Sequence, residues 1–398
     1  MNLLEGIRLL DLADEKASFC TKLLADMGAR VIKVERPGGD PSRKIGPFLG
    51  NVSHPERGLF FLYNNTNKLG ITLNLEHSEG KKIFRKLAER TDVVVESFSP
   101  GTLEKLELGF KSLIETNPRL ILVSVTGFGQ DGPRSQNKCC DLVASASGGQ
   151  MYVSGSPSTP PLRPFGEQSY YVASLFAAIA ILLALRRRNR SGKGEHIDIS
   201  LQEAVASTLE HVMIQYFYEK TIPKRRGNLH WNHAFCILPC KDGHILVSLF
   251  QQWETLVEWL DSEGMAGDLR DEKYLVEESR QSHRDHIIEV LQQWTMTHTR
   301  KELFELGQLM RFPWAPVCSP QEVLENPHLK SRGFFVEVDH PEIGKPIQYP
   351  GAPYKFDACS WDRLKRAPLV GQDNHKVYQG ELGLSYEELK RLSSIHVI

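Results

Sequence analysis

The sequence predicts an α/β protein whose strands form a mostly parallel sheet covered by helices on both faces. Short apolar runs alternate with amphipathic helical runs through the first two hundred residues. The first three elements, a strand over 7–12, a helix over 16–28 and a strand over 31–35, have the order of a βαβ unit. Because parallel strands need crossover connections, usually helices, this alternation favours a parallel sheet buried on both sides.

The elements that follow continue the same alternation. We expect strands over 71–75, 93–96, 120–125 and 196–200, helices over 80–89, 141–149, 170–188 and 201–218, and a short helix within 102–114. Gly28 suits the end of the first helix, because glycine adopts the left-handed backbone that closes a helix. The helix over 170–188 begins with a sixteen-residue apolar run. A membrane-spanning helix needs roughly 20 apolar residues, so we interpret this one as a buried core helix.

The sequence changes in composition near residue 220, which indicates a second domain. Five of the six tryptophans lie between 231 and 314, in a region where we expect helices over 252–261, 284–297 and 300–309 and a strand over 244–250. From about 331 the chain returns to extended segments and a last helix over 386–392. Since 398 residues exceed what one core usually holds, we expect a large domain over 1–219, a small α/β domain over 220–330 and a return to the large domain over 331–398.

Charge and composition narrow the class of protein. The net charge is −1, with 41% hydrophobic and 24% charged residues, so no global field draws the chain to nucleic acid or to a membrane. The seven cysteines are odd in number and scattered, which is typical of free thiols in a reducing compartment. The N-terminus lacks a basic start followed by an apolar core, so we read no signal peptide and expect a cytoplasmic protein.

Several common catalytic and metal-binding patterns are missing from the sequence. Residues 11–18 contain no glycine, which disfavours the glycine-rich turn of a dinucleotide site. Four candidate metal ligands fall within eleven residues: His230, His233, Cys236 and Cys240. Zinc sites usually separate two ligand pairs by a dozen residues or more, so we expect no metal. The adjacent Cys139 and Cys140 leave two interpretations open, a reactive thiol pair or packing residues.

Two strand ends carry residues suited to a phosphorylated ligand. Arg36 follows the strand over 31–35, and a guanidinium matches the geometry of a phosphate. Phe98 follows the strand over 93–96, where it can stack on a purine base or pack under the next turn. The glycine-rich loop 127–133 permits close approach of a ligand to the backbone. Open parallel sheets place ligands at the carboxyl ends of their strands, so Arg36 and Phe98 fall at the expected edge.

Taken together, the motifs resemble those of the class III coenzyme A (CoA) transferases, the family of formyl-CoA transferase and carnitine CoA-transferase. The matching runs are LADMGARVIKVER (24–36), NTNK (65–68), ITL (71–73), ESFSPG (96–101), GFGQDGP (127–133), SGKG (191–194), GAP (351–353) and RAPLVGQ (366–372). They occur in the family's order and cover nearly the whole chain.

The resemblance implies an architecture and a ligand. Each chain would be an open ring with a Rossmann-like large domain and a small domain, and two chains would interlock as a dimer. A CoA thioester would bind as substrate, with no permanently bound cofactor. The residues that the resemblance assigns to CoA binding are Arg36, Leu73, Ser97, Phe98, Lys105, Lys138 and Asp141. Ser97 stands where the family usually has asparagine, and Ala17–Phe19 replaces its Ala-Gly-Pro signature.

The family's nucleophile is an aspartate at the start of the long helix, and counting back from Gly192 places it at Tyr170. A carboxylate attacks the thioester and forms a mixed anhydride, which is covalent catalysis. Tyrosine, with a pKa near 10, is mostly protonated at neutral pH and forms no anhydride. Glu167 lies three residues earlier and has two interpretations: one helical turn would put it on roughly the same face as a candidate substitute, or it is a loop glutamate that precedes the helix.

Some class III transferases pair a catalytic chain with a similar chain that lacks the aspartate, as in succinyl-CoA:(R)-benzylsuccinate CoA-transferase. The resemblance therefore implies the non-catalytic subunit of an enzyme that moves CoA from an acyl-CoA, such as succinyl-CoA, to a carboxylic acid, with a paralogous catalytic partner. Three alternatives stay open: an autonomous transferase using Glu167, an acyl-CoA racemase-like protein, and a non-enzymatic CoA-binding scaffold. A racemase would need a histidine where Cys140 stands and an aspartate where Tyr170 stands.

Overall fold

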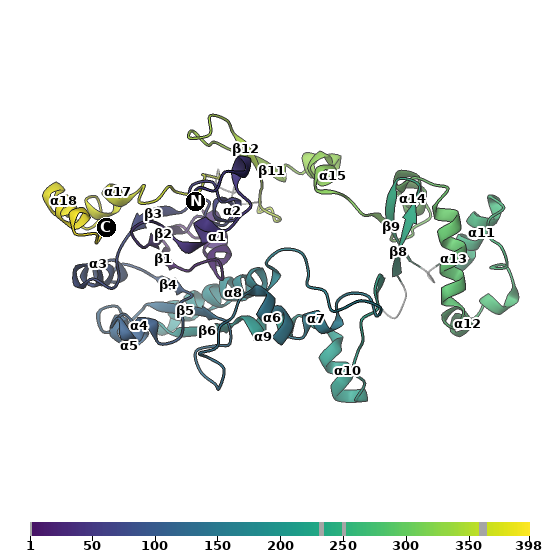
Figure 1. The fold of residues 1–398 in the computed structure, drawn as a ribbon, viewed down its shortest axis with the longest axis horizontal. Helices are drawn as coiled ribbons and strands as arrows, with labels where there is room; N and C mark the ends of the chain where they lie inside the picture. The colour runs from purple at the N-terminus through teal and green to yellow at the C-terminus, as the bar shows by residue number, and fades with distance from the viewer. Residues whose placement is uncertain (1, 231–234, 249–251, 358–363) are drawn as a thin grey trace. The chain divides into compact units, whose positions relative to one another are not determined.

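A six-stranded, wholly parallel sheet forms the centre of the larger part of the protein (Figure 1). The computed structural model describes residues 2–230, 235–248, 252–357 and 364–398. The strands are β1 (Arg8–Leu12), β2 (Arg30–Glu35), β3 (Leu69–Thr72), β4 (Val93–Glu96), β5 (Ile121–Thr126) and β6 (His196–Ser200), in the order β3-β2-β1-β4-β5-β6. The order reverses between β1 and β4, and doubly wound sheets bind ligands at such a switch point. The predicted fold class is confirmed.

Helices cover both faces of this sheet. The helices up to residue 219 are α1 (Ser18–Asp26), α2 (Leu59–Asn64), α3 (Ser78–Ala88), α4 (Thr102–Lys105), α5 (Phe110–Thr116), α6 (Asp141–Ser147), α7 (Gln150–Val153), α8 (Gln168–Ser191), α9 (Leu201–Ser207) and α10 (His211–Glu219), with 3₁₀ turns at Pro41–Lys44 and Leu49–Asn51. Helices α1, α6, α8 and α9 pack on one face, against Leu9, Val93 and Val123. Helices α3, α4 and α5 pack on the other, against Leu10 and Val94.

The end of the chain completes the second face. After the antiparallel strands β11 (Phe335–Val338) and β12 (Ile347–Pro350), helices α17 (Asn374–Tyr378) and α18 (Tyr386–Ser394) lie beside β3, as the yellow segment of Figure 1 shows. Val377 and Leu389 join the core that contains Ile71. The C-terminal segment therefore packs on the same unit as the N-terminal strands.

Helix α8 runs through the core of this unit. Its terminus is set by Gly192, which adopts a left-handed φ of 72° and donates its backbone amide to Arg188. By length and composition α8 could cross a membrane, yet half of its most apolar window is buried inside the protein. It packs on α1 and β5 as a core helix.

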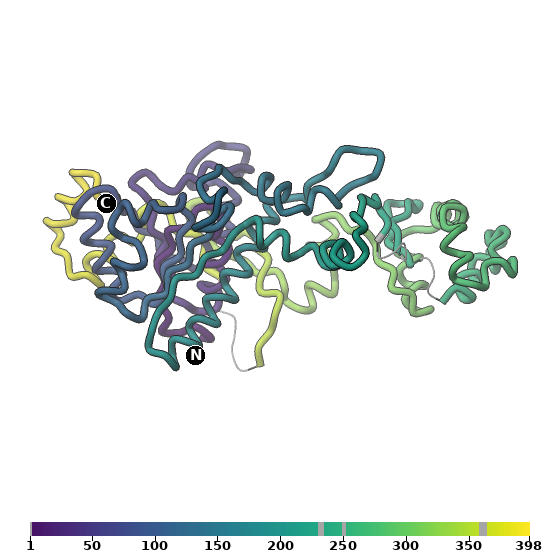
Figure 2. The backbone as a smooth tube through the Cα atoms, turned by 90° about the horizontal axis from the view of Figure 1, so that it is seen from below, coloured from purple at the N-terminus to yellow at the C-terminus, as the bar shows by residue number. Residues whose placement is uncertain are grey.

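A second unit contains residues 153–162 and 224–330, whereas the first contains 1–152, 163–223 and 331–398. Its elements, traced in Figure 2, are β7 (Leu229–His230), β8 (Phe235–Cys240), β9 (Gly243–Ser248), α11 (Trp253–Ser262), a 3₁₀ turn (Glu272–Tyr274), α12 (Glu277–Ser282), α13 (Arg284–Thr295), α14 (Arg300–Leu309), β10 (Ala315–Pro316), α15 (Pro320–Glu325) and α16 (Pro327–Ser331). The strands pair antiparallel in the order β10-β9-β8-β7. In its core Trp259 stacks on Trp314, and Trp294 packs edge-on against both rings.

One predicted helix is interrupted. The helix expected over 201–218 is broken between α9 and α10, where Glu210 has a φ of 43° that no helix accommodates. The segment 102–114, expected to include a short helix, contains α4 and most of α5, with Glu107 at a φ of 60° between them. Other boundaries differ by up to three residues. The domain limits at 219/220 and 330/331 remain a proposal, and His233 and Cys359 lie outside the described residues.

Candidate functional site

The loops that leave β1 and β4 at the switch point are joined by hydrogen bonds. The backbone amide of Asp14 donates to the Ser97 hydroxyl oxygen (2.8 Å), and this hydroxyl donates to the Asp14 carboxylate (2.6 Å). Ser97 is 3% exposed, so both bonds are shielded from water. Ser97 therefore fixes the distance between two loops at the position where this sheet type binds ligands.

Four other predicted CoA contacts follow β2, β3 and β4 and lie at the same edge of the sheet. Arg36 is exposed, and its Nε donates to the carbonyl of Gly39 (3.4 Å). Leu73 is buried in the core under α3, and Phe98 is half-buried against the same core. Lys105 is exposed at the end of α4. The structure thus places two cations and an aromatic ring along one sheet edge.

Beneath this edge lies a buried charge cluster that the sequence reasoning missed. Lys68 donates to Asp11 (2.8 Å) and to Asn65 (2.8 Å), and Thr21 also donates to Asp11 (2.7 Å). Burial would raise the pKa of Asp11, but the charges of Lys68 and Lys33 hold it below its usual value. Burial lowers the pKa of Lys68 to about 8 against the attraction of Asp11. Through Lys68, the Asn65–Lys68 motif therefore forms a buried ion pair with Asp11 on β1.

The glutamate preceding Arg36 has a structural role. Glu35 is 1% exposed and receives two bonds from Arg43, at 2.6 and 2.7 Å. The same guanidinium bonds Glu56 (2.6 Å) and the carbonyl of Pro368 (2.9 Å). This bidentate pair ties the end of β2 to the C-terminal segment.

Tyr170 is held at the start of α8 by the beginning of α6. The backbone amide of Asp141 donates to the Tyr170 hydroxyl oxygen (3.0 Å). In return the Asp141 carboxylate accepts from the amide of Ser169 (2.8 Å), and the Ser169 hydroxyl donates to the Asp141 carbonyl (3.1 Å). Tyr170 is 6% exposed, and burial raises the pKa of its phenol far above the usual value. The hydroxyl is thus a neutral hydrogen-bonding group, not a nucleophile.

Glu167 lies at the N-cap of α8 with its carboxyl group against Asp141. Burial raises the pKa of Glu167, and the charge of Asp141 and a hydrogen bond to it raise this pKa further. Arg163, with 3.7 Å between its nitrogen and the Asp141 carboxylate, partly opposes the shift. Glu167 therefore precedes the helix, and its carboxyl group holds a proton more strongly than that of an exposed glutamate.

Glu15 is a further carboxyl group near Tyr170 that sequence reasoning did not identify. It follows Asp14 in the loop after β1, and its charge contributes to the raised pKa of Tyr170. Burial raises the pKa of Glu15, and the neighbouring Asp14 adds to the shift. No motif marks Glu15, because only the fold brings the loop after β1 to the start of α8.

Of the two cysteines beside Asp141, Cys139 has the character of a packing residue, whereas Cys140 is exposed. Burial raises the pKa of Cys139 to about 11, with a further contribution from Cys140, so its thiol is less reactive than a free one. A side chain at Gly127 would come within 2.2 Å of the Cys139 Cβ, which explains the glycine at that contact. Lys138 is exposed one residue earlier.

No cluster of three or more metal-ligating side chains occurs among the residues that the structure describes. Cys236 and Cys240, two members of the considered His/Cys group, are buried in the core strand β8. Their pKa values are raised by burial, which disfavours the thiolates that a metal requires.

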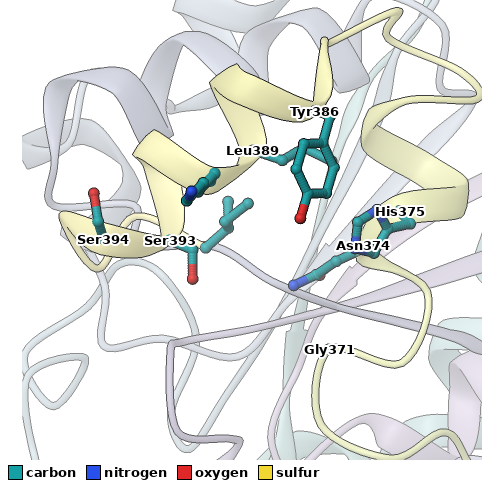
Figure 3. Close-up of a pocket in the computed structure, with 9 residues that line it drawn as sticks. Gly371, Asn374, His375, Tyr386, Leu389, Ser393 and Ser394 are labelled. Atoms are coloured by element: carbon teal, nitrogen blue, oxygen red, sulfur yellow. The ribbon is translucent and has the colours of Figure 1, made fainter.

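A separate cavity of about 520 Å³ lies between α18 and the start of α17 (Figure 3). It is lined by Gly371, Asn374, His375, Tyr386, Leu389, Lys390, Ser393, Ser394 and Ile398. The Asn374 side chain is already engaged, since it accepts from the Thr72 amide (2.9 Å) and donates to the Thr72 hydroxyl (2.9 Å). None of the predicted site residues lines this cavity.

The fold and the sheet edge define an α/β protein with a ligand position at a topological switch point. Comparison with known proteins makes this specific: the chain belongs to CoA-transferase family III, whose model matches residues 4–374.

Two curated relatives match almost end to end. The succinyl-CoA:(R)-benzylsuccinate CoA-transferase subunit BbsE of Thauera aromatica is 32% identical over 98% of this chain and 97% of the relative. The succinyl-CoA:mesaconate CoA-transferase of Haloarcula hispanica is 34% identical over 95% of each chain. Among solved structures, a CAIB/BAIF family protein from Brucella suis superposes with a TM-score of 0.87 at 28% identity, covering 96% of this chain and 100% of the other. The predicted family is confirmed.

Proposed function

We propose that this chain is the non-catalytic subunit of a heteromeric class III CoA-transferase. The observation that carries the proposal is Tyr170, which occupies the position that the family resemblance gives to the nucleophilic aspartate and whose hydroxyl is bound to the Asp141 amide. In the reaction, a carboxylate oxygen attacks the acyl carbon of the thioester, the C–S bond breaks and CoA leaves as a thiolate. The thiolate then attacks the enzyme's acyl carbon in the resulting anhydride, which gives an enzyme CoA thioester and releases the donor as its free carboxylate. The acceptor carboxylate attacks this thioester and expels CoA thiolate, and the thiolate attacks the acceptor's acyl carbon in the second anhydride, which gives the product thioester and frees the enzyme carboxylate.

The neighbouring carboxyl groups are poorly suited to replace the aspartate. A nucleophilic carboxylate acts in its ionised form, and the raised pKa values of Glu167 and Glu15 disfavour that form relative to an exposed glutamate. Glu167 also lies at the N-cap, before the helical turn that carries Tyr170. We therefore propose that a catalytic chain supplies the reacting carboxylate. The racemase alternative is weaker, because Cys140 and Tyr170 provide neither of its two proton-transfer groups.

An exposed apolar surface supports a protein partner. On α8, Leu175, Phe176, Ile179, Leu182 and Leu183 are exposed, and α10 exposes five further large apolar side chains: Met213, Ile214, Tyr216, Phe217 and Tyr218. Monomeric soluble proteins rarely leave many large apolar side chains of one helix in water, and each of these two helices exposes five. We propose a paralogous catalytic chain as partner and interlocked rings as the assembly. The Thauera relative is itself named as a subunit.

The proposed donor is succinyl-CoA and the proposed acceptor a carboxylic acid. The Thauera and Haloarcula relatives are named for succinyl-CoA as donor. The CoA contacts we propose for this chain are Arg36, Leu73, Ser97, Phe98, Lys105, Lys138 and Asp141. The reaction needs no permanently bound cofactor, and the proposal places it in the cytoplasm.

The test compares the chain alone with the chain and the family III protein that co-purifies with it. CoA transfer from succinyl-CoA to a dicarboxylic acid should require both chains. Replacing the partner's aspartate should abolish it, and Glu167→Gln in this chain should leave it intact. Full turnover by the lone chain, lost in Glu167→Gln with a hydroxylamine-trappable acyl-enzyme, would establish the autonomous enzyme instead. Failure of either assembly to bind CoA in calorimetry would favour the scaffold.

A further inference from the structure

Glu96 is a buried acid at the switch point whose role the proposed reaction leaves open. It ends β4, next to β1, and is 4% exposed. Its Oε2 accepts a hydrogen bond of 2.7 Å from the backbone amide of Phe98. This bond closes the turn that leads from β4 to Gly101, and the turn carries both Ser97 and Phe98.

Groups from three elements face the Glu96 carboxyl and set its charge. Burial raises the pKa of Glu96 to about 7. The hydroxyl of Ser124 on β5 and the charge of Lys16 in the loop after β1 act to lower it, whereas the charge of Glu104 on α4 raises it. Glu96 therefore changes its charge near neutral pH, unlike an ordinary glutamate.

Polar side chains also extend from Glu96 across β5 to β6, the outermost strand on that side of the sheet. The Ser124 hydroxyl that bonds Glu96 is also 2.9 Å from Nε2 of His196. His196 begins the edge strand β6 and is exposed, with Phe110 stacked on its ring. Ser124 itself is 2% exposed. The Ser124 hydroxyl therefore lies between the buried carboxyl and an exposed imidazole.

We propose that Glu96 is a positioning residue whose ionised carboxylate holds the Phe98 turn in its CoA-binding conformation. The role of this turn in CoA binding rests on the proposed function. The ionised acid makes a charge-assisted bond to the Phe98 amide, and such bonds are roughly twice as strong as neutral ones. As pH falls through 7, Glu96 takes up a proton, the bond weakens and the turn loosens. CoA affinity then falls with it.

Hydrogen exchange of the segment 93–106 tests the positioning role without any ligand. After correction for intrinsic exchange rates, the Phe98 amide of the wild-type chain should be about fivefold better protected at pH 8 than at pH 6, the ratio expected when a charge-assisted bond becomes neutral. Glu96→Gln should give the lower protection at both pH values. Glu104→Gln, at an exposed residue, should keep the transition but move its midpoint to lower pH.

Calorimetric titration with CoA then separates this inference from the proposed function. Wild-type affinity should fall about fivefold from pH 8 to pH 6, while Glu96→Gln binds weakly and independently of pH. A wild-type chain that binds no CoA would remove the CoA-binding part of the proposed function, and the exchange data would still decide the role of Glu96. Equal protection with equal pH dependence in wild type and Glu96→Gln would overturn the inference. Should Glu96→Gln fail to fold, Ser124→Ala takes its place, because removing this hydroxyl should move the midpoint of the pH-dependent protection to higher pH. A midpoint equal to that of the wild type would overturn the inference.

Discussion

Replacing Tyr170 with phenylalanine tests whether its hydroxyl is a structural hydrogen-bond acceptor. The substitution keeps the ring but removes the oxygen that accepts the Asp141 amide at 3.0 Å. Tyr170 is 6% and Asp141 5% exposed, so water replaces the lost partner poorly. A buried donor left without a partner costs about 1–3 kcal/mol, which is the expected loss in free energy of unfolding. Because burial raises the pKa of Tyr170 well above 10, the loss should be constant between pH 6 and 9.

The assay must report on the unit that contains Tyr170. Five of the six tryptophans lie between 231 and 314, in the second unit, so their fluorescence follows the wrong part of the chain. Urea unfolding by far-ultraviolet circular dichroism, with hydrogen exchange of the Asp141 amide, reports on the first unit. Tryptophan fluorescence serves as an internal control that should not change. Tyr218→Phe, at a side chain 86% exposed, should alter stability by less than about 0.5 kcal/mol. Unchanged stability and unchanged Asp141 exchange in Tyr170→Phe would refute the reasoning.

Three further changes probe the frame around the site. Arg43→Met leaves Glu35 charged and buried, and urea unfolding should show a loss of about 3–5 kcal/mol; a loss below 1 kcal/mol would contradict the buried pair. Gly80→Ala puts a Cβ 1.8 Å from the Asn74 carbonyl oxygen, so the thermal midpoint should fall with a cost of about 1–3 kcal/mol, and a neutral effect would disprove the close approach. A thiol reagent should modify the exposed Cys140 and Cys318 in the native protein and spare the buried Cys20 and Cys236, as peptide mass spectrometry would record; equal labelling would contradict the described burial.

The strands of the sheet could be predicted because each is marked by residues that are adjacent in the sequence. Each strand is a short apolar run, and a strand buried on both faces needs no longer-range information to be recognised. The break between α9 and α10 was missed because Leu209 and Val212 keep a helical spacing across 208–212, with no proline or glycine to mark a break. The helix ends at the C-cap Thr208 and Glu210 has a positive φ, and neither residue type marks such a change in the sequence.

The site was predicted less completely, for a physical reason. Arg36, Ser97 and Phe98 follow strands, so their place at one edge of the sheet could be inferred from the strand pattern. Contacts between distant segments could not be inferred in this way. Lys68 bonds to Asp11, 57 residues away in the sequence, and the Asp141 amide bonds to Tyr170, 29 residues away. The interpretation of Glu167 as a substitute nucleophile depended on helical spacing from Tyr170. The helix begins only at Gln168, so Glu167 precedes it.

Restoring the family's carboxylate with Tyr170→Asp should not by itself restore a nucleophile. The shorter side chain leaves a space where the buried ring was and does not reach the Asp141 amide. Glu15 and Glu167 both act on Tyr170 through their charges, and Asp141 lies against it, so a new acid there would have its pKa raised. The raised pKa makes the folded state bind more protons than the unfolded state above about pH 4, so stability should fall as pH rises, relative to wild type. Urea unfolding at pH 5 and pH 8 measures this difference, and succinyl-CoA turnover by the lone variant should stay absent. Turnover by that variant would mean that the surroundings of Tyr170 still form a working active site, and that the residue at this position alone accounts for the inactivity proposed for the wild-type chain.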